Sequence, residues 1–287
     1  MTNTNKTLLD EFSINGQLVL LTGGGGEICG CIGERFAGIG AIVILADVNT
    51  EAAERRARAI RERGGTASSL FCDVLDVNSI NACVQEVENQ YGVPDILVNG
   101  AGGNQARGSA EVSFCEAGDL EDPSRRTYFD LEPEGLRQVL DLNLLGTMLP
   151  SQRVGARMAK RGSGAIVNIS SMNAHTPLTR IPAYAAAKSA VSNFTQWLAV
   201  HLAHTGVRVN AVAPGFVMTE QLRFLHVNQT TGEYTDRAKA VIAHTPMRRY
   251  AEPEEIAGAV LYLASAAARF VTGTVIPIDG GFSSYSV

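Results

Sequence analysis

Short apolar runs alternate with amphipathic stretches along most of the 287-residue chain. The runs are rich in Val, Ile and Leu, which predicts buried strands, and the stretches between them have the 3.6-residue period of helices. Strands that alternate with helices in this way are typical of a parallel sheet covered by helices on both faces. The predicted strands are 17–22, 41–46, 67–71, 95–98, 166–169, 207–212 and 274–278. We therefore expect one α/β domain over residues 1–287, with a doubly wound parallel sheet of about seven strands.

The predicted helices are 28–39, 51–63, 77–91, 136–160, a stretch from Ala183 onward, and two shorter ones at 217–226 and 237–244. One connection, 103–130, is long, polar and irregular, and such a loop in a compact domain is usually functional or disordered. We expect this insert to cover a substrate pocket together with 216–249. An exposed loop or a subunit contact is the alternative.

The amino-acid composition argues against several classes of protein. The chain is 45% hydrophobic and 18% charged, which is ordinary for a soluble globular protein, and its net charge of −5 does not favour nucleic acid as a partner. No apolar run is long enough to span a membrane, and the N-terminus lacks the apolar core of a signal peptide. The five cysteines have no paired Cys-x-x-Cys spacing, which indicates free thiols in the cytoplasm rather than disulfides or a metal site.

A glycine-rich loop, TGGGGEICG at 22–30, follows the first predicted strand. Glycines there allow tight turns and close approach of a ligand, and the next helix presents free N–H groups to phosphate. Asp47 ends the second strand, where an acid accepts hydrogen bonds from an adenosine ribose and repels a 2′-phosphate. The pattern predicts a dinucleotide site that prefers NAD. The alternative is a structural turn in which Asp47 caps the next helix.

Tyr184 and Lys188 lie one helical turn apart in an alanine-rich stretch, so they share a helix face. A nearby positive charge favours the phenolate, and such a tyrosine donates a proton to a carbonyl or withdraws one from an alcohol. Ser171, just after the 166–169 strand, is placed to hold the same oxygen. The alternative is a solvated Tyr–Lys pair, which is common in helices.

Several features stand together in one order: the glycine loop, Asp47, Asp73, NGAG at 99–102, Asn143, Ser171, Tyr184, Lys188, and Pro214-Gly215 with Thr219. The spacings from Asn143 to Ser171 and from Ser171 to Tyr184 are 28 and 13 residues. From about residue 17 to residue 282 the chain resembles the short-chain dehydrogenase/reductase family. The resemblance implies a Rossmann fold, an NAD(H)-dependent oxidoreductase acting on CH–OH donors, and a homotetramer.

The resemblance also implies roles at matching positions. Tyr184 would be the general acid/base, and Lys188 would lower its pKa and bind the nicotinamide ribose. Ser171 would polarise the substrate carbonyl, and Asn143 would hold a water in a proton relay to Lys188. Asp73 would contact adenine, Asn99 the adenosine side and Thr219 the nicotinamide amide. The expected cofactor contacts are Thr22, Gly23, Gly25, Gly26, Glu27, Ile28, Asp47, Asp73, Val74, Asn99, Gly100, Ala101, Tyr184, Lys188, Pro214, Gly215, Val217 and Thr219.

Two places depart from the family's pattern. The loop usually reads Thr-Gly-x-x-x-Gly-x-Gly, but Glu27 and Cys29 occupy its second and third glycine places, with Gly26 and Gly30 one position to either side. Because a carboxylate repels pyrophosphate, we expect Glu27 to point to solvent or pair with a cation; a weakened cofactor site is the alternative. Gly100 replaces one asparagine of the usual Asn-Asn-Ala-Gly, which we expect the fold to tolerate.

Longer phrases, including NGAGGN at 99–104, SSMNAHTPLTRIPAY at 170–184 and DGGFSSYSV at 279–287, resemble a narrower branch, the D-mannonate oxidoreductases. That branch interconverts D-mannonate and D-fructuronate with NAD. A sugar acid needs a cation for its carboxylate and hydrogen-bond partners for its hydroxyls. Candidates for the cation are Arg107, Arg125, Arg126 and Arg180, each with a solvated or interface position as its alternative. Candidates for the other contacts are Gly103, Asn104, Asn173 and His175.

We therefore expect an NAD-dependent enzyme that interconverts a secondary alcohol and a ketone of a sugar acid. Another carbonyl, such as a 3-oxoacyl thioester or a polyol ketone, is the enzymatic alternative. A non-catalytic dinucleotide-sensing protein is the alternative of another class, and the presence of Asn143, Ser171, Tyr184 and Lys188 argues against it. We expect Trp197, the single tryptophan, to pack in the core or against another subunit.

Overall fold

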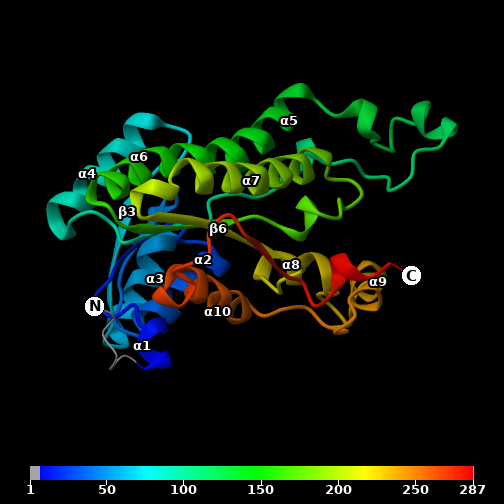
Figure 1. Cartoon of the computed structure of the whole chain (residues 1–287). Coiled ribbons are helices and arrows are strands. Elements are labelled where there is room, and N and C mark those ends of the chain that lie inside the picture. The colour runs from blue at the N-terminus through cyan, green and yellow to red at the C-terminus, as the bar shows by residue number, and fades with distance from the viewer. Residues whose placement is uncertain (1–6, 287) are drawn as a thin grey trace.

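All seven predicted strands join one parallel sheet in the computed structural model, which describes residues 7–286 (Figure 1). Their order is β3-β2-β1-β4-β5-β6-β7, so the strand order reverses between β1 and β4 and the doubly wound prediction is confirmed. The bounds are β1 (Leu18–Thr22), β2 (Ile42–Asp47), β3 (Thr66–Phe71), β4 (Ile96–Asn99), β5 (Gly164–Ile169), β6 (Val207–Pro214) and β7 (Val275–Ile278). Parallel pairing brings the carboxyl ends of all these strands to one edge, where ligands bind in such folds.

Helices cover both faces of the sheet (Figure 1). One face carries α2 (Glu27–Ala37), α3 (Thr50–Glu62) and α10 (Pro253–Ala264), and the other carries α4 (Val77–Tyr91), α5 (Pro133–Leu140), α6 (Gly146–Arg161) and α7 (Pro182–His201). The other α-helices of the described residues are α1 (Leu8–Phe12), α8 (Glu220–His226) and α9 (Asp236–His244). Within residues 7–286, no helix has the length and apolar character needed to cross a membrane.

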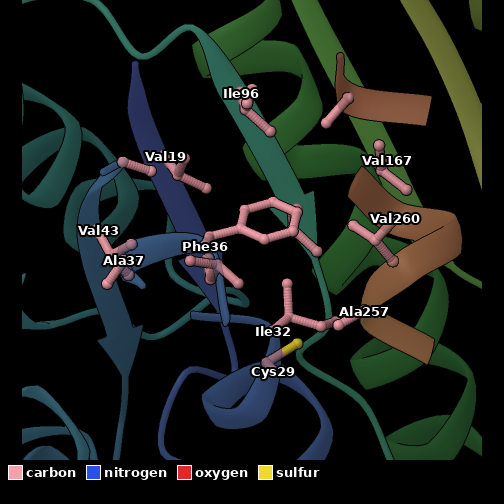
Figure 2. Close-up of a cluster of buried hydrophobic side chains, with 14 of the residues drawn as sticks. Val19, Cys29, Ile32, Phe36, Ala37, Val43, Ile96, Val167, Ala257 and Val260 are labelled. Atoms are coloured by element: carbon pink, nitrogen blue, oxygen red, sulfur yellow. The ribbon is translucent and has the colours of Figure 1, made fainter. Parts of the chain in front are cut away.

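Two hydrophobic clusters fill the spaces between the sheet and its two helix layers. Figure 2 shows the first, in which Phe36 and Ile32 of α2 lie between strand residues such as Val19 and the α10 residue Val260. Because both faces of the central strands are buried, their sequences are continuous apolar runs rather than alternating ones. Burying a side chain such as Phe36 stabilises the fold by roughly 1.5–3 kcal/mol.

The structure corrects some helix predictions. The predicted helix over 136–160 is interrupted, because a π-helical turn at Asp141–Leu145 separates α5 from α6. The predicted helix at 217–226 starts only at Glu220, since Val217 forms a β-bridge with Ala251. Helix α10 was not predicted, although Pro253 at its first turn and the capping box of Glu252 are recognisable start signals.

The insert at 103–130 consists of loops and three short 3-10 turns, and it extends past α5 away from the sheet (Figure 1). It is attached to the segment that precedes α7: the N–H of Ala110 donates to the carbonyl of Arg180 (2.7 Å), and Arg180 Nε donates to Ser113 Oγ (3.0 Å). A cavity of about 620 Å³ lies between the insert and α7. Tyr184 does not line this cavity, and the covering role of the insert stays a prediction.

Candidate active site and dinucleotide pocket

Ser171 and Tyr184 come together at the carboxyl edge of the sheet. Ser171 follows β5, and its Oγ accepts hydrogen bonds from the backbone N–H (3.2 Å) and Nδ2 (3.1 Å) of Asn173. Tyr184 lies in the first turn of α7, which Pro182 starts, and its phenol is a hydrogen-bond partner of Ser171. The two hydroxyls are therefore placed to bind one substrate oxygen.

Lys188 lies one turn further along α7 and is 4% exposed. Its Nζ donates to the carbonyl of Ile169 at the end of β5 (2.8 Å) and lies 5.6 Å from the centroid of the Tyr184 ring. Burial lowers the pKa of Lys188 from 10.5 to about 8, and Cys29 acts weakly in the opposite direction. An amine with this pKa exchanges protons close to neutral pH.

The direction predicted for the pKa of Tyr184 is wrong in this arrangement. Burial raises the pKa of the phenol above its ordinary value of 10, and the hydrogen bond with Ser171 offsets part of that rise. Lys188 does not contribute to the pKa shift, and its ammonium is hydrogen-bonded to the Ile169 carbonyl. Ser171, rather than Lys188, is the group that favours the phenolate here.

Asn143 lies in the π-helical turn, fully buried. Its Nδ2 donates to the carbonyls of Gly103 (2.7 Å) and Val139 (2.8 Å), and its Oδ1 accepts from the N–H of Gly103 (3.1 Å). A Cβ on the neighbouring Gly102 would lie 2.7 Å from Asn143 Oδ1 and 3.3 Å from Lys188 Nζ. Asn143 thus holds this turn against Lys188; its relay role stays a prediction.

A cavity of about 700 Å³ opens between the glycine loop and the turn after β4. A Cβ on Gly23, which has a φ of 67°, would lie 2.8 Å from the N of Ala101, and a Cβ on Gly25 would lie 2.9 Å from the Cβ of Ala52. These glycines therefore let the loop pack closely against the turn after β4 and against α3, and the N-terminus of α2 faces the cavity. The cradle therefore fits the pyrophosphate of a dinucleotide.

Asp47 braces this loop. Its Oδ2 accepts from the N–H of Gly25 (2.9 Å) and its Oδ1 from that of Asn49 (2.8 Å). Asn49, not Asp47, caps α3 through its side chain, so the alternative that Asp47 serves as the helix cap is wrong.

Comparison with known proteins decides the family. The family model for enoyl-(acyl carrier protein) reductase matches residues 27–283. A crystal structure from Haemophilus influenzae, provisionally named a D-mannonate oxidoreductase and holding NAD, is 43% identical with a TM-score of 0.90, covering 96% of this chain and 97% of its own. This chain belongs to the short-chain dehydrogenase/reductase family. It is an NAD(P)-dependent oxidoreductase acting on secondary alcohols and ketones.

Two further relatives are informative. A gluconate 5-dehydrogenase from Burkholderia cenocepacia, solved with NADP and tartrate, is 30% identical with a TM-score of 0.84 and covers 98% of this chain and 100% of its own. The D-threitol dehydrogenase of Mycolicibacterium smegmatis is 35% identical and covers 99% of both chains.

The structure places only some of the residues expected around the cofactor on the lining of this cavity. The expected residues that do not line it, besides the three described below, are Thr22, Asp47, Asp73, Ala101, Tyr184, Lys188, Pro214 and Gly215. Gly23, Gly25, Gly26, Glu27, Ile28, Gly100 and Thr219 line the cavity. The side chains of Asn99, Val74 and Val217 are buried, and Asn99 Nδ2 donates to Ser151 Oγ and Asn168 Oδ1 (both 2.8 Å). Val74 and Val217 therefore have only backbone polar atoms to offer a cofactor, whereas Asn99 Oδ1 is buried without a hydrogen-bond partner among the described residues.

Sequence reasoning missed the α3 side of the cavity, which is lined by Ala52, Arg55, Arg56 and Ala59. Arg56 Nε donates to the carbonyl of Gly25 (3.3 Å), and its guanidinium pairs with Glu34 (3.0 Å). A Cβ on Gly30 would lie 2.0 Å from Arg56 Cδ, so Gly30 provides room for this arginine. The spacing of three to four residues on the helix that follows Asp47 was the available signal.

Glu27 is partly exposed, and within residues 7–286 it forms no ion pair with a cation, so that part of the expectation is wrong. Its Oε1 accepts a hydrogen bond from the backbone N–H of Glu220 (2.7 Å) at the start of α8. The N-terminal N–H groups of a helix are free and carry partial positive charge, so a carboxylate is stabilised there. Glu27 thus connects the glycine loop to α8, whose N-cap is Thr219.

The candidates for substrate binding are spread apart. Asn173 is buried and its amide is used internally, by Ser171 Oγ and by the N–H of Leu178 (2.9 Å), so it orients Ser171 rather than a ligand. His175 is exposed and lines none of the described cavities that flank α7. Asn104 Nδ2 donates to Ser109 Oγ within the insert (2.8 Å).

Proposed function

We propose that this protein is an NAD-dependent dehydrogenase that interconverts a secondary alcohol and a ketone of a sugar acid, of the D-mannonate/D-fructuronate type. The observation that carries the proposal is the convergence of Ser171, Tyr184 and Lys188 beside a glycine-lined cavity of about 700 Å³. The nicotinamide cofactor supplies or accepts the hydride, and the protein orients the reactants and manages the proton.

The proton moves at the Tyr184 hydroxyl. Ser171 and Tyr184 hold the substrate oxygen, and Tyr184 donates its proton as a carbonyl is reduced or accepts one as an alcohol is oxidised. A phenol with a raised pKa is a competent donor but a reluctant base. Lys188 has a pKa of about 8 and lies close enough to return a proton to the Tyr184 hydroxyl, or to take one from it, between turnovers.

Asp47 supports the choice of NAD over NADP. Its carboxylate lies at the end of β2 and faces the loop at Gly25, so a 2′-phosphate on the adenosine ribose would meet a negative charge. The Haemophilus influenzae relative holds NAD, while the more distant gluconate dehydrogenase holds NADP.

Arg180 is the best-placed cation for a substrate carboxylate. Three of the four candidate arginines are in ion pairs, Arg107 with Glu132, Arg125 with Asp119 and Arg126 with Glu111. Within residues 7–286, Arg180 pairs with no carboxylate, and it lies four positions before Tyr184, outside α7. Its φ of 74° is unfavourable for a residue with a side chain, and such strain is found most often at functional sites.

A polyol ketone is the second candidate substrate, since the D-threitol dehydrogenase is 35% identical over 99% of this chain. The two candidates differ in whether the substrate carries a carboxylate, and only a carboxylate gives Arg180 a role.

Assembly is part of the proposal. Trp197 is 59% exposed and Val200 78%, so Trp197 does not pack in the core. Trp197 stacks on His201 (4.9 Å between centroids) and the two form an aromatic face on α7. We propose that this face packs against another subunit, in the homotetramer that the family resemblance implies. Five unpaired thiols support a reducing compartment, the cytoplasm.

The experiment is an NADH oxidation screen over fructuronate and other keto sugar acids, with polyol ketones and 3-oxoacyl thioesters as contrast sets. We expect turnover of a keto sugar acid, and Arg180→Ala to raise its KM about tenfold or more. Arg107→Ala, which removes an arginine paired with Glu132, is the matched control and should leave KM near that of the wild type. Turnover of polyol ketones alone, unaffected by Arg180→Ala, refutes the sugar-acid assignment.

A further inference from the structure

The two departures from the family's pattern meet in space. Cys29 lies in the first turn of α2, and Gly100 follows β4. A Cβ built on Gly100 would lie 1.9 Å from Cys29 Sγ and 3.1 Å from the carbonyl oxygen of Thr22. The first distance is far below any real contact between these atoms, so no side chain fits at position 100 while Cys29 holds its place.

The Cys29 side chain has little freedom to move aside. It is 3% exposed and belongs to the hydrophobic cluster between the sheet and α2, where Figure 2 shows its sulfur beside Ile32. Its Sγ is only one bond beyond Cβ, so relieving the contact requires another rotamer inside a packed core.

Gly100 begins a turn that reaches the catalytic lysine. Thr22 Oγ1 accepts hydrogen bonds from the N–H groups of Gly100 (3.1 Å) and Ala101 (3.3 Å). The next residue, Gly102, lies directly against Lys188 Nζ. A shift at Cys29 is therefore passed along 100–102 to both the cavity and Lys188.

We propose that Cys29 and Gly100 form a matched pair, in which the Cys29 sulfur fills the space of a side chain at position 100 and fixes the turn over 99–102 on the floor of the dinucleotide cavity. Cys29 is then a positioning residue for the cofactor and not a reactive thiol; burial raises its pKa to about 12. The inference rests on the proposed cofactor site. It predicts that substituting either Cys29 or Gly100 alone weakens cofactor binding, whereas substituting both together is tolerated.

The test compares NADH dissociation constants, by fluorescence titration, for Gly100→Asn, Cys29→Gly and the double variant. We expect each single variant to bind NADH about tenfold more weakly or worse. Gly100→Asn overfills the space between residues 29 and 100, and Cys29→Gly leaves that space empty. Independent effects would multiply to about a hundredfold in the double variant. The matched pair predicts instead that the double variant binds within about threefold of the wild type.

Controls separate positioning from general stability. Cys31→Ser changes a second buried cysteine in α2 that does not line the cavity, so it should lower the melting temperature without changing NADH affinity. If Gly100→Asn does not fold, Gly100→Ala is compared in the wild-type and Cys29→Gly backgrounds. Multiplicative losses, or wild-type affinity in Gly100→Asn or in Cys29→Gly, overturn the pairing. A wild-type protein that binds no NADH instead refutes the cofactor site itself.

Discussion

Replacing Lys188 by methionine tests the burial of this lysine through the stability of the protein. The pKa of Lys188 falls from 10.5 to about 8 because its ammonium is buried. At 1.36 kcal/mol per pKa unit, this difference amounts to about 3 kcal/mol against the folded state wherever the lysine must be charged. Methionine has a similar length and no charge, so it removes this penalty.

The sign of the pH dependence follows from proton counts. Between pH 8 and pH 10.5 the unfolded chain holds the lysine proton while the folded protein has released it, so raising the pH favours folding. The free energy of unfolding of the wild type should therefore rise relative to Lys188→Met by about 3 kcal/mol across this window. Below pH 8 the difference between the two proteins should be constant.

The absolute stability at pH 7 is a poorer test. Methionine cannot donate to the Ile169 carbonyl, and leaving a buried carbonyl unpaired costs about 1–3 kcal/mol, which offsets much of the gain. Urea denaturation at several pH values and one protein concentration isolates the slope, because all other groups titrate alike in both proteins. Lys160→Met, at an exposed lysine, is the control and should parallel the wild type. A Lys188→Met profile that also parallels the wild type refutes the burial argument.

Two further predictions concern the cofactor loop. Asp47→Ala should raise kcat/KM with NADPH at least about tenfold relative to NADH, because the charge that opposes the 2′-phosphate is removed; unchanged cofactor discrimination would count against the ribose contact. Glu27→Ala should speed hydrogen exchange of the backbone N–H groups at the start of α8 about tenfold, because the N–H of Glu220 loses its acceptor. Glu27→Gln keeps an acceptor oxygen, so these N–H groups should exchange more slowly in it than in the alanine variant. Equal exchange in the wild type and both variants would contradict the connection between Glu27 and α8.

The sheet was predictable because its strands are buried on both faces and read as apolar runs such as LVLLT and IVILAD. The helix after Tyr184 was predictable from alanine content and from Pro182 at its start. The convergence of Ser171 and Tyr184 follows from the same local patterns, since one ends a strand and the other begins the next helix.

The contacts that shape the site were not predictable, because they join residues far apart in the sequence. Glu27 meets Glu220 across 193 positions, and Asn143 holds Gly103 across 40. The helical pattern over 136–160 gives no sign of the π turn, whose extra residue places Asn143 in the core. Nor does the sequence reveal how deeply a group is buried, which is why the direction of the Tyr184 pKa was predicted wrongly.

Turnover of the Tyr184→Phe variant tests the central claim most directly. The substitution removes only the hydroxyl that carries the proton, so NADH affinity should stay near that of the wild type. With the keto acid that the wild type reduces fastest, kcat should fall at least about a hundredfold. Turnover equal to the wild type would contradict the assignment of Tyr184 as the proton carrier.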